Sequence, residues 1–372
     1  MKGEPIRVLH VLTGMNRAGA ETMLMNLFRA VDQDRVQFDF AVSSTKRCDY
    51  DDEIEALGGR IIHYPRYRGI NHLTYKKWWN DFFRTNPVYK IVHGHIGSTA
   101  SIYLAIAKRF GCFTIAHSHN ANFSSGPHGY AYRVYSYSTR YIADFFIGCS
   151  TEALVSRYGK KVAYDRRISC LLNNGIDVEK YRYSASVREE VCRELQIKEG
   201  TLVVGTVGRF TKQKNPLFMV EIIEKLKSLT DDFVFLWVGT GEMTPEVKCT
   251  IDRKGLTGNV NLLGVRKDVP RLLQAMNVFI LPSLFEGLPV VGVEVQAAGV
   301  PMLCSENVSL EVKITDCISF LPIRSSGLWA ERILNEKSFR RVEGAADDVI
   351  RAGYDVKTTA EWLTEFYESK VK

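Results

Sequence analysis

The sequence predicts an α/β protein of two doubly wound, Rossmann-like domains that face each other across a cleft. Two observations carry this prediction. Short apolar strands alternate with helix-length segments along the whole chain, and the alternation restarts with a new first strand near Thr201. Strands rich in Val, Ile, Leu and Phe in such an alternation are typical of parallel sheets covered on both faces. Ligands of these sheets bind beyond the carboxyl ends of the strands.

The expected strands follow in chain order. In the first half they are residues 6–12, 36–42, 60–64, 90–95, 112–118, 145–150 and 168–172. In the second half they are residues 201–208, 233–239, 259–264, 277–283 and 300–305. The turn NNGID and the polar segment after it predict a boundary, so we assign residues 1–180 to the first domain and 181–355 to the second. Residues 356–372 hold a last helix, which we expect to pack back on the first domain.

Composition narrows the class of protein. The chain has 372 residues, 45% of them hydrophobic and 24% charged, as in a globular protein. It holds no apolar run of 18 residues, so no transmembrane helix is expected, and the apolar N-terminus is interpreted as a strand, not as a signal peptide. Eight scattered cysteines without a CxxC pair indicate free thiols in a reducing compartment. We therefore expect a cytoplasmic protein.

The most informative motif is LPSLFEGLPVVGVEVQAAG at residues 281–299. It predicts a strand end, a loop that contains Glu286, and a helix that contains Glu294. The free N–H groups near Gly287 and Leu288, at the helix start, suit an anion such as a diphosphate. Two carboxylates on either side of it suit the hydroxyl groups of a sugar and of a ribose, because carboxylates accept charge-assisted hydrogen bonds. The alternative is an ordinary pair of solvated glutamates.

Two further segments of the second half point to the same ligand. In TVGRFTKQKNP (206–216), Arg209 and Lys214 follow a buried strand, and we assign both cations to a diphosphate leaving group. A basic surface turn is the alternative. Val265 and Arg266 follow another strand, where a nucleotide base could stack or bond, although this signal is weak alone.

Two segments of the first half are candidates for the same cleft. The turn TGMNRAGAET (13–22) brings Gly19 to a helix start, a plausible place for a phosphate, but it matches neither GxGxxG nor a P-loop. In AHSHN (116–120), His117 and His119 share one side of a strand. We favour a histidine that bonds the donor sugar over satisfied structural histidines. A metal site built with the similar pair His93 and His95 is disfavoured, because neither a carboxylate nor a cysteine completes it, and no metal is assigned.

These motifs in this order resemble family 4 glycosyltransferases, the retaining, GT-B-type enzymes of polysaccharide and glycolipid assembly. The resemblance spans nearly the whole chain and is most specific in FEGLPVVGVE; GRF…QKN, NGID and the AGAE turn support it, and AHSHN is similar to the capsular or exopolysaccharide branch. It implies transfer of a hexose from a UDP- or GDP-sugar, with retention and without metal or cofactor. The first domain would bind a glycan or lipid-linked acceptor, and the second the donor.

The resemblance also implies residue roles. Glu286 would contact the donor sugar, Glu294 the ribose, and Arg209 and Lys214 the diphosphate, while Gly19 would approach the phosphates. His117 or His119 would reach the transferred sugar, and no catalytic base is named. Ala18 and Asn277 depart from the family's usual Gly and Asp. Remaining alternatives are an epimerase-like enzyme of the same architecture and a non-catalytic protein that binds sugar nucleotides.

Charge adds a hypothesis about location. The net charge is +7, and the segment from Arg60 to Arg140 carries Asp81 as its one acid among many cations and aromatic residues. Basic residues with Trp and Tyr favour an anionic membrane surface. We therefore consider peripheral docking on the cytoplasmic membrane face. The alternative is that the charges are solvated and the aromatic residues belong to the core. No nucleic-acid motif accompanies them.

Overall fold

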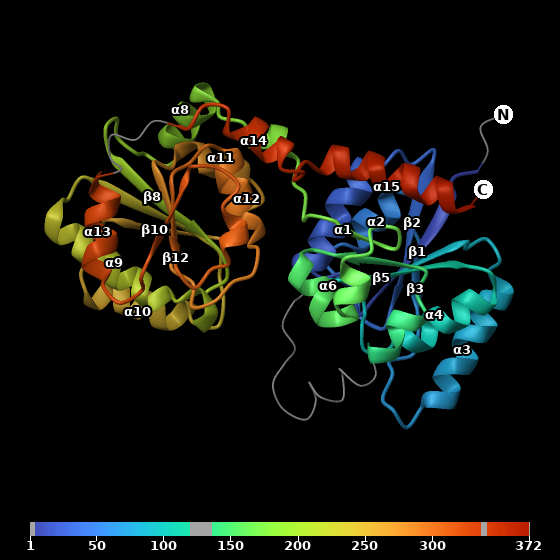
Figure 1. The fold of residues 1–372 in the computed structure, drawn as a ribbon. Helices are drawn as coiled ribbons and strands as arrows, with labels where there is room; N and C mark the ends of the chain where they lie inside the picture. Colours follow the sequence, from blue (N-terminus) through green and yellow to red (C-terminus); the bar gives the residue numbers. More distant parts are fainter. Residues whose placement is uncertain (1–3, 120–135, 336–340, 372) are drawn as a thin grey trace. The chain divides into compact units, whose positions relative to one another are not determined.

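The computed structural model describes residues 4–119, 136–335 and 341–371. The chain forms two compact units, shown in Figure 1. Unit 1 comprises Met1–Gly175 and Val356–Lys372, and unit 2 comprises Ile176–Asp355. The sequence analysis places the boundary at residue 180, a few positions further along.

Unit 1 is built on a parallel sheet in the order β3-β2-β1-β4-β5-β6-β7. Its strands are β1 (Ile6–Leu12), β2 (Val36–Val42), β3 (Ile61–His63), β4 (Ile91–Gly94), β5 (Phe113–Ser118), β6 (Phe145–Gly148) and β7 (Ser169–Leu171). Its helices are α1 (Gly19–Ala30), α2 (Asp51–Ala56), α3 (His72–Thr85), α4 (Ala100–Arg109), α6 (Thr151–Tyr158), α7 (Lys160–Ala163) and α15 (Val356–Val371), with a 3-10 turn η1 (Ser138–Tyr141). The strand order reverses direction between β1 and β4, which makes that gap the switch point of the sheet.

Two apolar layers cover this sheet, one on each face. Helices α1 and α15 pack on the face that carries Val8, Leu12 and Ile115. Helices α3 and α4 cover the other face. Ion pairs from Arg35 to Glu361 and Glu368, at 2.7 and 2.9 Å, tie α15 to the start of β2. The last helix of the chain is therefore an integral part of unit 1, as Figure 1 shows.

Unit 2 repeats the plan with a parallel sheet in the order β10-β9-β8-β11-β12-β13. Its strands are β8 (Leu202–Val207), β9 (Phe233–Val238), β10 (Val260–Gly264), β11 (Val278–Leu281), β12 (Met302–Ser305) and β13 (Ile318–Leu321). Its helices are α8 (Ala185–Glu194), α9 (Pro216–Leu229), α10 (Thr244–Arg253), α11 (Val269–Ala275), α12 (Val290–Ala297), α13 (Ser326–Asn335) and α14 (Ala345–Arg351), with 3-10 turns η2 (Val178–Lys180), η3 (Lys212–Lys214) and η4 (Leu310–Val312). Here the switch point lies between β8 and β11.

The predicted fold class is confirmed: each unit is a doubly wound α/β sheet of parallel strands. The sequence analysis did not predict β13. All eight cysteines are free. Among the described residues, no helix combines the length and the apolar character that a membrane crossing requires.

Candidate functional site

The strongest cluster of predicted site residues lies at the switch point of unit 2. Lys214 follows β8 and Glu286 follows β11, and these two strands are neighbours in the sheet. Lys214 Nζ lies 2.5 Å from Glu286 Oε1, and both side chains are largely buried. The hydroxyl of Ser283 also donates to Glu286 Oε1, at 3.2 Å. Parallel sheets bind their ligands at this edge, so the ion pair stands where a ligand of unit 2 is expected.

The two loops that carry this pair are joined by further hydrogen bonds. Leu284 N donates to Gln213 O at 2.8 Å, and the side-chain amide of Gln213 donates to Phe285 O at 3.1 Å. Asn215 donates to Pro282 O at 3.2 Å. Asn215 also has a φ of 56°, a left-handed conformation that is uncommon outside glycine. The loops after β8 and β11 therefore form one connected structure that fixes Lys214 against Glu286.

Arg209 lies on the same loop as Lys214 but is exposed. Within the described part of the chain it forms no salt bridge. Arg209 and Lys214 both line a small cavity at the end of β8, together with Gly208 and Trp237. One unpaired cation and one paired cation thus lie together at the end of β8, and two such cations suit a diphosphate.

Two glycines of the VGTGE segment, after β9, allow close backbone packing at this edge. A Cβ on Gly239 would lie 2.0 Å from Gly208 O, and Gly239 has a φ of 129°. A Cβ on Gly241 would lie 2.5 Å from Phe210 O. These glycines are therefore required by the approach of one loop to the next.

Gly287 and Leu288 lie between Glu286 and helix α12, as the sequence analysis expects. Gly287 is exposed, and a Cβ there would meet nothing within 4 Å. Pro289 caps α12 without a side-chain hydrogen bond. The first N–H groups of α12 therefore lack a side-chain cap, which leaves them available to a ligand.

Glu294 lies inside α12 and has a partner that the sequence analysis missed. The hydroxyl of Tyr181 donates to Glu294 Oε1 at 2.7 Å. Burial raises the pKa of Glu294, and the hydrogen bond from Tyr181 opposes part of that rise. No sequence motif indicates Tyr181, because 113 positions separate it from its partner.

Val265 and Arg266 follow β10. Val265 is 70% exposed and offers an open apolar surface. Arg266 is engaged in two hydrogen bonds to Asp268, both at 2.7 Å. No hydrogen bond or ion pair of the described residues joins these two to Glu286.

In unit 1, Gly19 is the first residue of α1, at the switch point between β1 and β4. A Cβ on Gly19 would meet nothing within 4 Å, so packing does not demand glycine there. Ala18 caps α1 without a side-chain hydrogen bond. The helix start is thus open, as the predicted phosphate approach requires.

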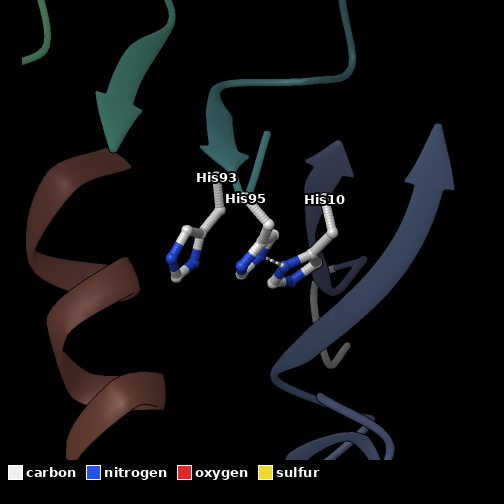
Figure 2. Close-up of side chains that lie close together, drawn as sticks. All are labelled: His10, His93 and His95. Atoms are coloured by element: carbon white, nitrogen blue, oxygen red, sulfur yellow. Dashed lines mark hydrogen bonds between the residues drawn. The ribbon is translucent and has the colours of Figure 1, made fainter. Parts of the chain in front are cut away.

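The most unusual feature of unit 1 is a row of five histidines on one face of its sheet. We call this set the histidine face: it comprises His10, His93, His95, His117 and His119. The strand register explains it, because His10 on β1 pairs with His93 on β4 and every second residue shares a face. His10, His93 and His117 are buried, and the rings of His93 and His95 stack with centroids 4.4 Å apart. Figure 2 shows the rings of His10, His93 and His95 side by side.

The histidine face is held together by hydrogen bonds between rings. His10 Nδ1 lies 3.0 Å from His95 Nε2, and His95 Nδ1 lies 2.8 Å from His119 Nε2. His93 Nε2 lies 3.2 Å from His117 Nδ1, and His93 Nδ1 lies 2.7 Å from the hydroxyl of Tyr367 on α15. The sequence analysis did not foresee His10 or Tyr367 as members of this network.

Burial keeps these imidazoles neutral. Desolvation lowers the pKa of His10 to about 3 and that of His119 to about 4. It also lowers the pKa of His93, His95 and His117 well below the ordinary value, with the neighbouring histidines adding to the effect. At neutral pH each ring therefore carries one N–H and one acceptor nitrogen.

The hydrogen-bonded rings of His10, His95 and His119 form a row. Because each ring is neutral, the N–H groups along this row can be arranged in only two ways. Each ring has only one N–H, so all the protons along the row point the same way. Nε2 of His10 is buried without a partner, and buried donors are left unpaired more rarely than acceptors. The favoured row thus places the protons on Nδ1 of His10 and His95. His119 then accepts at Nε2 and can donate from Nδ1 to a ligand.

Comparisons with known proteins identify relatives of this chain in both sequence and fold. The family model described as glycosyl transferases group 1 matches residues 187–316. The Bacillus subtilis (strain 168) protein EpsF, named as a glycosyltransferase, is 31% identical over 99% of this chain and 97% of its own. A galactosyltransferase of Escherichia coli that acts on GlcNAc-diphosphoundecaprenol is 30% identical over 58% of each chain. The structure of Anabaena HepE in complex with UDP superposes with a TM-score of 0.78 at 16% identity, over 98% of this chain and 100% of that one.

Proposed function

The chain belongs to the group 1 glycosyltransferases, and we propose that it transfers a hexose from a nucleotide-diphosphate sugar to a glycan or lipid-linked acceptor, with retention of the anomeric configuration. We place this reaction in the assembly of a capsular or extracellular polysaccharide. The relatives support the proposal, since one is named for transfer to a diphosphoundecaprenol-linked sugar. The observation that carries it is the Lys214–Glu286 ion pair at the switch point of unit 2.

In this proposal unit 2 holds the donor. Lys214 and Arg209 face the diphosphate, where their charges stabilise the negative charge that grows as the bond to the sugar breaks. Glu286 accepts hydrogen bonds from the sugar hydroxyls, and the ion pair with Lys214 orients its carboxylate. Glu294 accepts from the ribose beside the hydroxyl of Tyr181. The N–H groups near Gly287 and Leu288 add donors to the phosphates.

Unit 1 carries the other residues that we assign to the donor. The start of α1 at Gly19 approaches the phosphates, and His119 donates from Nδ1 to the transferred sugar. His117 is the second candidate for that contact. No metal ion or cofactor takes part, because Arg209 and Lys214 supply the positive charge. The acceptor hydroxyl gives its proton to the departing diphosphate, so no protein group is required as a base.

We also propose that unit 1, to which we assign the acceptor, docks on a membrane surface. Tyr75, Trp79 and Phe83 are buried in unit 1, so these aromatic residues belong to the core and cannot contact lipid. Ile70 and Leu73 replace them in the hypothesis, because they are 96% and 80% exposed at the start of α3. Exposed cations lie on both sides of them in the sequence: Arg66, Arg68, Lys76 and Lys77, the last of which pairs with Asp81. Apolar side chains within a basic surface suit an anionic lipid surface.

The proposal is tested with labelled UDP- and GDP-sugars and a diphosphoundecaprenol-linked sugar acceptor. We expect one donor to give a lipid-linked product whose anomeric configuration, measured by NMR, equals that of the donor. Lys214→Ala should lower kcat about 10²–10³-fold, as the loss of a transition-state charge contact does. Lys212→Ala, two residues away and exposed, is the control. An inverted product, or epimerised donor without transfer, would contradict the proposal.

A further inference from the structure

The histidine face of unit 1 contains three rings, those of His10, His93 and His95, to which we assign no contact with the donor. We propose that His10, His93 and His95 bind a first-row transition metal ion such as Zn²⁺. The site is in unit 1 and is separate from the diphosphate site of unit 2, for which no metal is proposed. It does not rest on the transfer reaction, because metal binding is measured without substrate.

The first argument is geometric. One ring nitrogen from each of the three histidines lies within 4.8 Å of the others, among the residues that the structure describes. Zn²⁺ binds imidazole nitrogen at about 2.0–2.1 Å, so the nitrogens around one ion lie a little over 3 Å apart. His10 Nδ1 and His95 Nε2 are already 3.0 Å apart. To bind the same ion, His93 must exchange one of its two hydrogen bonds, to Tyr367 or to His117, for the metal.

The second argument concerns the number of ligands, because the fold adds a third histidine to the pair on β4. The pair His93-x-His95 alone is too few for a stable site, and no nearby carboxylate or cysteine is visible in the sequence. The register of β1 and β4 places His10 opposite His93 and so supplies the third imidazole. Three histidines with an open fourth position are an established zinc arrangement, and imidazole also suits copper, nickel and iron.

The third argument is the unpaired nitrogen of His10. His10 is 0% exposed, and its Nε2 has no hydrogen-bond partner. A buried polar atom without a partner is rare in proteins and calls for an explanation. A His10 ring that turns Nε2 toward an ion gives this nitrogen a partner, which explains why a histidine, and not an apolar residue, stands inside this core.

The fourth argument is the outer partner of His95. Histidine ligands usually donate their second N–H to another group, which orients the ring. If His95 binds the ion through Nε2, its Nδ1–H donates to His119 Nε2, at the observed 2.8 Å. The bound ion would therefore fix the same proton arrangement that leaves Nδ1–H of His119 available to a ligand.

In a second set of three, His95, His117 and His119, one nitrogen of each ring also lies within 4.8 Å of the others. It shares His95 with the first set, so the two sets cannot both be filled through the same nitrogen. Each set includes one buried ring with an unpaired Nε2, His10 in the first and His117 in the second. We favour the first because two of its three rings are buried, against one in the second. It also leaves His117 and His119 available to the donor sugar.

The test uses the full-length protein, stripped of metal and dialysed against Zn²⁺ or Co²⁺ alone. We expect one ion per chain, visible absorption typical of four-coordinate Co²⁺, and three imidazole ligands in the X-ray absorption spectrum of the Zn²⁺ form. His10→Ala, His93→Ala and His95→Ala should each weaken binding by more than the 10–100-fold that loss of an outer partner costs. His119→Ala should weaken it by about that 10–100-fold. The exposed His63→Ala and His72→Ala variants are matched controls.

Several results would overturn the proposal. One is no binding above that of buffer in the intact protein. Another is binding that survives in the His10 and His95 variants but is lost in the His63 or His72 variants. The variants at buried positions could fail to fold, so the X-ray absorption spectrum of the unmodified Zn²⁺ protein is a second test. Fewer than three imidazole ligands in that spectrum would refute the site.

Discussion

Lowering the pH from 7.5 to 5.5 should unfold unit 1 before unit 2. Unit 1 buries the five rings of the histidine face in neutral form, with a pKa of about 3 for His10 and about 4 for His119. In the unfolded chain the same rings titrate near 6.5. Between those values the unfolded state binds more protons, so stability is present above pH 6.5 and is lost as the pH falls below it.

The magnitude follows from this difference. At pH 5.5, one unit below the unfolded pKa, each buried ring costs about 1.4 kcal/mol of stability relative to pH 7.5. Five rings together cost up to about 7 kcal/mol, which is comparable with the whole stability of an ordinary domain. Unit 2 contains no histidine, since all eight lie in the first 128 residues. The raised pKa of Glu294 has the opposite sign, so acid does not weaken unit 2 through that group.

The assay is pulse proteolysis of metal-free protein in a denaturant series at each pH, with fragments assigned to the two units by mass spectrometry. We expect the unit 1 transition to move to much lower denaturant at pH 5.5 and the unit 2 transition to move little. His10→Gln should reduce the pH-dependent loss in unit 1 by about 1.4 kcal/mol. Equal loss in both units, or a stability of unit 1 that ignores pH between 7.5 and 5.5, would refute the idea that these imidazoles are buried and neutral.

Three further predictions concern the proposed transfer reaction. Glu286→Ala should remove most turnover and leave nucleotide affinity nearly intact. Glu294→Ala should weaken the binding of UDP or GDP at least about tenfold, because a buried charged hydrogen bond contributes about 1.5–3 kcal/mol. The variant Glu306→Ala, at an exposed position, is the control, and equal effects of the first two variants on nucleotide binding would contradict the two roles. Transfer should persist in EDTA with the donor site intact, and loss that Mg²⁺ or Mn²⁺ restores would show a metal at the diphosphate. Ile70→Ser with Leu73→Ser should reduce co-sedimentation with anionic vesicles at low salt, and unchanged binding, or binding that ignores lipid charge, would leave membrane docking unsupported.

The sequence predicts most of the fold because local patterns determine it. Twelve expected strands correspond to β1 to β12, within a few residues at each end. Strand β13 (Ile318–Leu321) was not predicted; polar residues such as Thr315 and Asp316 precede it and a proline follows it directly, so its few apolar residues lack the context of a strand.

The residues of the candidate site could be predicted from the sequence, but most of their contacts could not. The positions of Lys214 and Glu286 at strand ends can be predicted, but their ion pair depends on β8 and β11 being neighbours although two strands lie between them in the chain. His10 meets His93 for the same reason, because β1 and β4 are adjacent. Tyr181 and Tyr367 reach their partners over separations of 113 and 274 residues. Such contacts follow from strand order and packing, and no local pattern indicates them.

The histidine face has a cost that ordinary packing does not explain. An apolar side chain in place of His10 would fill the same strand position without a buried unpaired nitrogen and without sensitivity to acid. Val8 and Leu12, on the same face of β1, belong to the apolar core, so an apolar residue would also fit the surroundings of position 10. Features that break local rules tend to occur at functional sites, and this one lies at the switch point of unit 1, where doubly wound sheets bind ligands. The row from His10 through His95 to His119 gives one physical reason, because it sets which nitrogen of His119 can donate. Loss of His95 should therefore change transfer through His119 even without metal, and a His95→Gln variant whose metal-free kinetics equal those of the parent protein would show that the row has no such role.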